Sequence, residues 1–159
     1  MKNIPLRVNN LVKKYGTRDP FLLASYLNLN VKFCEYSDNT KGYYINVKRN
    51  KFIIINANLT EEEKRIVLAH EIGHAVLHSS KEVHFIRENT LFPKGKHENE
   101  ANKFAAEILV NLDEIDKCYI EEFSINQLAG FLMVPQELLI FKFENNIWSL
   151  TKLLNILHC

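Results

Sequence analysis

The sequence is poor in cysteine, and the cysteines that it has are not arranged for cross-linking. The chain has 159 residues and three cysteines, Cys34, Cys118 and Cys159, which lie far apart and without any CxxC spacing. An odd number of scattered cysteines argues against a disulfide framework and against a zinc site made only of cysteine. We therefore expect the protein to work in a reducing cytosol.

An excess of charge of one sign and a long apolar run are also missing. Lys and Arg number 20 against 19 Asp and Glu, which leaves a net charge of +1. Such a chain has no general field to attract nucleic acid or an anionic membrane. No segment reaches the roughly 20 apolar residues of a membrane span, and the N-terminal residues contain no signal-peptide core. We expect a cytoplasmic protein that recognises its partner locally.

The composition that remains is that of a globular domain, with 47% apolar and 25% charged residues. Residues 31–36, 42–47 and 51–56 are rich in β-branched and aromatic side chains, as strands are. Helical periodicity at residues 5–15, and Asp19 as a possible N-cap before Pro20, predict two short helices ahead of them. The fold class expected is α+β, with a small antiparallel sheet of about three strands.

A long helix follows the predicted strands. Thr60 and Glu63 form the pattern of a capping box, which predicts a helix start at Thr60. A second helix is expected over residues 99–112, and residues 81–95 between the two helices are predicted to form a loop long enough to suggest function. Residues 124–157 are typical of short helices, so the C-terminal section should be helical.

The helix that starts at Thr60 carries the sequence HEIGH among apolar residues. His70 and His74 are four residues apart, so their side chains lie side by side on one helix face and can share a metal ion. Glu71 is rotated by about 100° from His70, where it could hold a water beside that ion. This is the arrangement of HExxH, with two zinc ligands and a general base. His78 lies about 12 Å from His70 along the axis, which is too far to bind the same ion, so we expect it to support a ligand, to face the substrate or to be structural.

A structural explanation of these histidines is the alternative. A single histidine on an apolar helix is usually a core residue with a satisfied ring. Two imidazoles and a carboxylate in one apolar helix would cost roughly 1–3 kcal/mol for each unpaired group. A metal ion would satisfy both imidazoles at once, so we favour a metal site.

A catalytic zinc needs a third protein ligand and an open position for water. The helical segment 97–109 supplies Glu98, Glu100 and Glu107. Asn102 lies four residues after Glu98 on the same face, where it could hydrogen-bond a liganding histidine. Glu100 points about 200° away from Glu98, so only one of the two can serve the same ion. Glu98 is the preferred third ligand and Glu100 remains the alternative.

HExxH followed by Glu-x-x-Ala-Asn resembles the glutamate-zinc metallopeptidases, and the wider pattern over residues 40–112 resembles the ImmA/IrrE family. The resemblance implies Zn²⁺ on His70, His74 and Glu98, with Glu71 as the catalytic base. Residues 1–118 would then form the metallopeptidase domain. The remaining residues, 119–159, would be a helical C-terminal extension packed on that domain, or the two parts would make one continuous domain.

The resemblance further implies a zinc-dependent endopeptidase of restricted specificity that cleaves a transcriptional repressor or other regulator of a mobile element or phage. Bound zinc would acidify a water and polarise the scissile carbonyl, while Glu71 takes the proton of the water and passes it to the leaving amine. The alternative is a binding module that sequesters a repressor without cutting it. The intact Glu71 favours the enzyme, because a purely structural metal site gains nothing from a base.

The expected partner is a protein substrate. A strand edge beside the zinc helix would suit an extended peptide held by main-chain hydrogen bonds. Four side chains near the site, Tyr43, Tyr44, His84 and His97, are expected to be structural or exposed rather than catalytic.

The C-terminal section loosely resembles a helix-turn-helix. Residues 119–159 carry a net charge of −2, which disfavours direct binding of nucleic acid. The same residues could cover the back of the domain or dock a protein substrate. The apolar residues 147–159 could pack on either surface.

Overall fold

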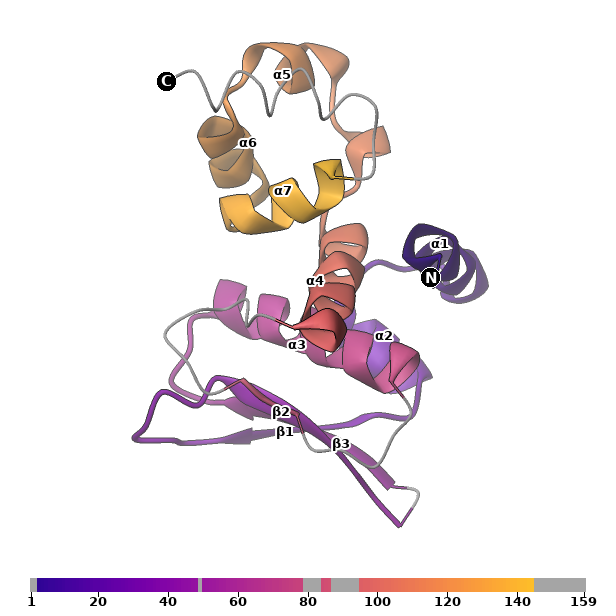
Figure 1. The fold of residues 1–159 in the computed structure, drawn as a ribbon, viewed down its shortest axis with the longest axis vertical. Helices are drawn as coiled ribbons and strands as arrows, with labels where there is room; N and C mark the ends of the chain where they lie inside the picture. The colour runs from indigo at the N-terminus through magenta and orange to yellow at the C-terminus, as the bar shows by residue number, and fades with distance from the viewer. Residues whose placement is uncertain (1–2, 49, 79–83, 87–94, 145–159) are drawn as a thin grey trace.

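In the computed structural model, which describes residues 3–48, 50–78, 84–86 and 95–144, helices cover one face of a small sheet. The described elements follow one another as α1 (Ile4–Tyr15), α2 (Pro20–Tyr26), β1 (Asn30–Cys34), β2 (Gly42–Val47), β3 (Asn50–Asn56), α3 (Glu61–Leu77), β4 (His84–Ile86), α4 (Lys96–Leu109), the 3-10 turn η1 (Leu112–Glu114), α5 (Lys117–Glu122), α6 (Ile125–Leu132) and α7 (Gln136–Phe143). Figure 1 shows the sheet at one end of the molecule, α3 across it, and α5, α6 and α7 at the other end. The predicted α+β class is confirmed.

The helix starts follow local capping signals. Thr60 caps α3, and a full capping box joins it to Glu63, as the sequence predicted. Asp19 accepts hydrogen bonds from the first backbone amides of α2. Helix α4 begins at Lys96, three residues before the predicted start, and it ends at Leu109 because Val110 is already extended. Because helix ends depend on such boundary residues, a periodic pattern predicts the bounds of a helix less accurately than it predicts the helix itself.

The sheet is mixed, with the strand order β1-β3-β2-β4. Strand β2 is antiparallel to both β3 and β4, whereas β1 is parallel to β3, so the expectation of an antiparallel sheet is wrong at that pairing. The reason is that β3 lies between β1 and β2. Ile53 and Ile55 of β3 are fully buried, and a central position gives this apolar strand a neighbour on each edge.

The fourth strand lies inside the segment that was predicted to be a loop. Strand β4 has only three residues and pairs with β2 at Gly42, Tyr43 and Tyr44. Three residues are too few for an alternating pattern to show in the sequence. The rest of the predicted loop lies outside the described residues.

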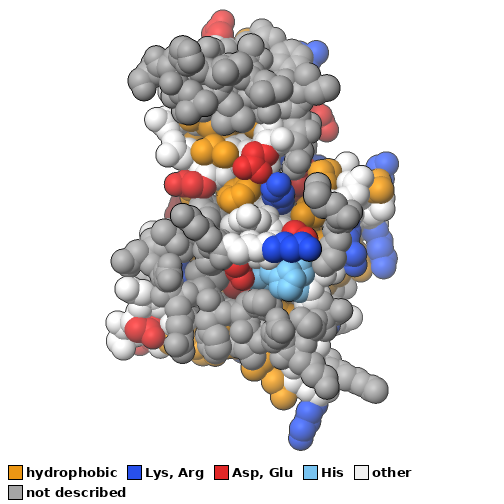
Figure 2. Space-filling model, viewed as in Figure 1, with side chains coloured by type: hydrophobic (Ala, Val, Ile, Leu, Met, Phe, Trp, Pro, Cys, Tyr) orange, Lys and Arg blue, Asp and Glu red, His pale blue; other side chains and the backbone are white. Residues whose placement is uncertain are grey.

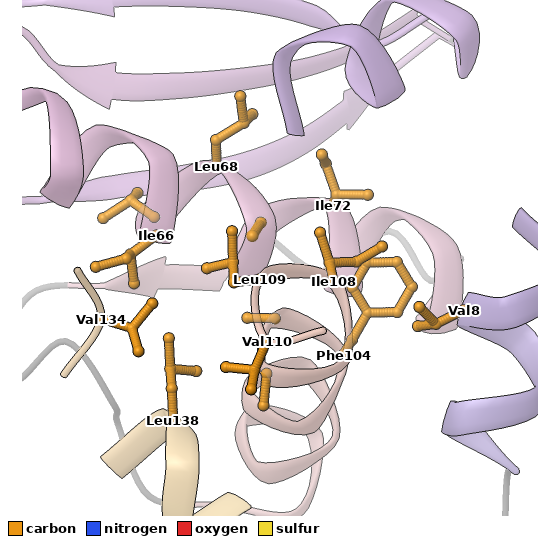
Figure 3. Packing of buried hydrophobic residues seen from close by; sticks show 14 of the residues in the cluster. Val8, Ile66, Leu68, Ile72, Phe104, Ile108, Leu109, Val110, Val134 and Leu138 are labelled. Carbon is orange, nitrogen blue, oxygen red and sulfur yellow. The ribbon is translucent and has the colours of Figure 1, made fainter. Parts of the chain in front are cut away.

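The core joins both ends of the molecule through α3 and α4. Figure 3 shows one packed cluster, which contains Leu68 and Ile72 of α3, Phe104 and Ile108 of α4, and Leu138 of α7. A Cβ atom added to Gly73 would lie only 3.0 Å from the Cα of Ala101, so a glycine there lets α4 approach α3 closely. This close approach sets the position of α4 against the histidine helix.

The C-terminal helices rest on α4 through α7, whose Leu138 and Leu139 are fully buried. The predicted division after residue 118 remains a prediction, and the apolar residues 147–159 lie outside the described residues. No helix in the described part of the chain combines the length and the apolar character needed to cross a membrane.

Candidate metal centre

The middle of α3 supplies two imidazoles and a carboxylate that are shielded from solvent. His70, Glu71 and His74 are exposed by 1%, 0% and 0% respectively. They lie within a 17-residue helix with apolar neighbours on nearly every side. Such burial is costly for polar groups that have no partner, so the contacts of these three side chains decide what the site can do.

The structure brings His70, His74 and Glu98 together. The Nε2 atoms of the two histidines are 3.0 Å apart. The Glu98 Oε2 atom lies 3.1 Å from Nε2 of His70 and 3.2 Å from Nε2 of His74. Among the described residues these three form a group whose ligand atoms could hold one metal ion. The group spans α3 and the first turn of α4.

The tautomer of His70 shows that the group fits a cation. Asn102 Oδ1 lies 2.7 Å from Nδ1 of His70, and an amide oxygen can only accept, so Nδ1 carries the proton. In the neutral ring Nε2 then has a lone pair that faces the carboxylate of Glu98, so this contact needs either a proton on Nε2 or a metal ion between the two atoms. Tetrahedral ligands 2.0–2.1 Å from zinc are about 3.3 Å apart, close to the separations in this group.

The charges of Glu98 and His74 agree with this picture. Burial alone would raise the pKa of Glu98, but hydrogen bonds and charge attraction from His70 and His74 outweigh it and hold the pKa below its usual range. Burial lowers the pKa of His74, although its hydrogen bond to Glu98 opposes that change. An ionised Glu98 beside a neutral His74 is the protonation state in which both side chains can bind a metal.

Glu71 is in a different position. It is fully buried, and neither of its carboxylate oxygens has a hydrogen-bond partner among the described residues. Burial raises its pKa well above the ordinary value, the charge of Glu98 adds to the rise, and a weaker interaction with the backbone of Tyr44 opposes it. A carboxyl group with an elevated pKa close to a candidate metal site is suited to accept and return a proton.

The alternative ligand Glu100 faces a different partner. Its Oε2 atom lies 3.7 Å from Nε2 of His78, which caps the end of α3. The ring of His97 stacks on that of His78, with centroids 4.3 Å apart. His78, His97 and Glu100 therefore form a separate group beside the candidate metal ligands. Of the three glutamates considered as ligands, Glu98 is the one that contacts both His70 and His74.

The tyrosines of β2 lie on opposite faces of the sheet. Tyr44 is fully buried on the side of α3, and within the part of the chain that the structure describes its hydroxyl has no hydrogen-bond partner; burial raises the pKa of this hydroxyl. The Tyr43 hydroxyl lies 3.2 Å from that of Tyr36. His84 is in β4, which pairs with the edge of β2 that faces away from β3. Strand β4 is therefore the edge strand on that side of the described sheet.

Two contributions to the site were not foreseen in the sequence. The first is the close approach at Gly73, for which the only signal was a glycine inside a helical pattern. The second is the approach of the Tyr44 backbone to Glu71, which depends on strand pairing and left no signal in the local sequence.

Known proteins are similar to this chain over most of its length. The Peptidase_M78 family model, described as the IrrE N-terminal-like domain, matches residues 24–121. The chain is 42% identical over 135 residues to the uncharacterized immunity region protein 2 of Bacillus phage phi105, which covers 85% of each chain. It is 24% identical over 156 residues to the metallopeptidase ImmA of Bacillus subtilis strain 168, with 93% of this chain and 92% of the relative covered.

Proposed function

Because the chain belongs to the ImmA/IrrE peptidase family, we propose that it is a zinc-dependent endopeptidase whose substrate is a transcriptional repressor or similar regulator of a phage or mobile element. Family membership makes the protein a peptidase of a metal-dependent kind. The zinc ion, the internal cut and the regulator as substrate are the parts that we propose.

The single observation that supports the proposal most strongly is the convergence of His70, His74 and Glu98 on one point beside the buried Glu71. Two imidazoles and one carboxylate are a ligand set that zinc uses in hydrolases, where a fourth position stays open for water. We assign the three side chains as the zinc ligands. Asn102 would keep the His70 ring in the tautomer that can bind.

Bound zinc would acidify a water molecule and polarise the carbonyl of the scissile bond. The part of Glu71 is to take the proton of the attacking water and to deliver it to the nitrogen of the leaving amine. Its burial among apolar residues excludes bulk water that would compete for that proton. A nearby positive charge would also favour the ionised form that accepts a proton.

The substrate proposal has two supports. The relative from Bacillus phage phi105 is named for an immunity region, which favours a phage regulator as the substrate. The outer edge of the sheet beside α3 is also suited to hold an extended peptide by main-chain hydrogen bonds, and β4 is the described strand nearest that edge.

The direct test is incubation of the zinc-loaded protein with the regulator encoded beside its gene, followed by mass spectrometry of the products. We expect one internal cut that EDTA abolishes and added zinc restores. A regulator that forms a complex with the protein and stays intact would contradict the endopeptidase and support sequestration.

A further inference from the structure

A pocket of about 500 Å³ lies apart from the metal centre. Its walls come from α1, from the residues that follow α2, from Lys51 of β3 and from the last turn of α3. None of the four side chains of the candidate metal centre and its base lines it. A concave volume of this size is in the range of small-molecule sites.

The rim of the pocket is cationic. Arg7 and Lys14 of α1 line it together with Lys51, and no Asp or Glu does. No ion pair joins any of these three cations to a carboxylate of the described residues. Figure 2 shows Lys and Arg side chains gathered at the edge of the molecule where α1 lies. Three cations around one hollow favour an anionic ligand.

The floor of the same pocket is aliphatic. It is made by Leu11 of α1, by Leu27 and Leu29, and by Ala75 and Val76 of α3. Leu29 and Ala75 are already buried, but a bare inorganic anion would leave the partly exposed Leu11, Leu27 and Val76 in contact with water. A ligand that carries an aliphatic body behind its charged group would cover them and gain the free energy of apolar burial.

An aromatic body fits less well. The ring of Tyr15 lines the pocket, but it stacks on Tyr26 with centroids 5.3 Å apart and planes 3° apart. The ammonium of Lys14 lies 4.9 Å from the centroid of the same ring. Because both contacts already use the π faces of Tyr15, the ring has little left for a ligand to stack on.

We propose that this pocket binds a small organic anion, a carboxylate or phosphate monoester with an aliphatic body. Val76 is two residues after His74 and so points about 200° away from it around α3. The ligand would therefore sit against the helix that carries the candidate metal centre, on the side away from Glu98.

The test is isothermal titration calorimetry on the zinc-loaded full chain with four probes. Octanoate and octyl phosphate carry both parts of the proposed ligand and differ in the head group. Octan-1-ol has only the aliphatic body, and inorganic phosphate has only the charge. We expect at least one of the first two to bind roughly tenfold more tightly than either of the last two. Equal binding of octanoate, octyl phosphate and octan-1-ol, or no binding of the two amphiphilic anions, would overturn the proposal.

Charge variants locate the binding. Arg7→Gln combined with Lys51→Gln should weaken the tighter probe by about tenfold or more, since each change removes a charged partner of the anion. Lys13→Gln is the matched control, because Lys13 is an exposed neighbour on α1 that does not line the pocket. An equal loss in Lys13→Gln would show non-specific attraction and would contradict the site.

A carboxylate could instead bind the zinc, and backbone amide NMR separates the two cases. Binding in the pocket should shift the amide signals of Leu29 and Val76 first. Shifts centred on His70 and Asn102 would place the probe at the metal. That result would contradict the proposed pocket ligand but would not contradict the proposed peptidase activity.

Discussion

Asn102 accepts a hydrogen bond from His70 across the interface between α4 and α3, with 2.7 Å between Oδ1 and Nδ1. This contact fixes both the orientation of the His70 ring and the nitrogen that carries its proton. Asn102 is fully buried, so no water can easily take its place as the acceptor. The contact therefore prepares Nε2 of His70 for a cation before any cation binds.

Replacement of Asn102 tests that role. We expect Asn102→Ala to weaken zinc binding by about 10-fold to 100-fold, the usual cost of losing the partner of a liganding histidine. Asn102→Asp keeps an acceptor at the same place and should lose less. Competition with a chromophoric chelator measures both affinities. Wild-type affinity in Asn102→Ala would show that the contact has no part in metal binding.

The third ligand is tested by a pair of matched variants on α4. Glu98→Ala should strongly lower the zinc content, because it removes the oxygen that lies within 3.2 Å of both histidines. Glu100→Ala should leave zinc close to one per chain, because Glu100 faces His78. Metal analysis of the purified variants gives the two values, and the reverse order would make Glu100 the ligand.

Glu71→Gln separates catalysis from metal binding. The side chain keeps its size but can no longer accept the proton of water, so we expect cleavage to fall by roughly 10²-fold to 10⁴-fold. Zinc content should stay near that of the wild type, because the variant keeps all three proposed ligands. Substrate cleavage and metal analysis are measured on the same preparation. Cleavage at the wild-type rate would remove Glu71 from the mechanism.

Gly73→Ala tests the close approach of α3 and α4. The added Cβ would lie 3.0 Å from the Cα of Ala101 and 3.2 Å from the Cβ of Phe104, so the two helices must separate. We expect a loss of about 1–3 kcal/mol in the free energy of unfolding, together with weaker zinc binding as Glu98 moves away.

Gly130→Ala is the control for this change. Gly130 is also inside a helix, but its added Cβ meets nothing within 4 Å. The free energy of unfolding should rise by roughly 0.5–1 kcal/mol, because alanine is the better helix former. Denaturant unfolding measures both variants, and equal losses in the two would show that the helix contact is not tight.

The capping box makes stability depend on pH through Glu63. Hydrogen bonding to the backbone of Thr60 lowers the pKa of Glu63, and the charge of Lys41 adds to this against the effect of burial. Because the pKa of Glu63 is lower in the folded state, its ionised carboxylate stabilises the fold at a pH above the pKa that Glu63 has in the unfolded chain. This stabilisation is lost as the pH falls through the folded-state pKa.

Glu63→Gln should therefore destabilise the protein by up to about 1 kcal/mol at neutral pH and by progressively less in acid. Glu62→Gln, in the same turn of α3 and without a part in the capping box, is the control. Thermal unfolding at several pH values measures both. A deficit for Glu63→Gln that does not shrink in acid would contradict this account.

Much of the site could be predicted because it depends on contacts that are local in sequence. The start of α3 follows from Thr60 and Glu63, which are three residues apart, and the shared face of His70 and His74 follows from helix geometry. In the same way, Asp19 as an N-cap directly before Pro20 predicted the start of α2. In each case one turn of backbone contains all the information that is needed.

The sequence by itself determined which residues could serve as ligands and base, since HExxH on a helix leaves His70, Glu71 and His74 no other relative arrangement. Only the tertiary structure shows that Glu98, and not Glu100, lies beside both His70 and His74, because that placement depends on how α4 is rotated where Gly73 lets it touch α3. It also decided the parallel pairing of β1 with β3. Long-range packing sets these features, and no local period in the sequence encodes the rotation of one helix against another or the order of strands in a sheet.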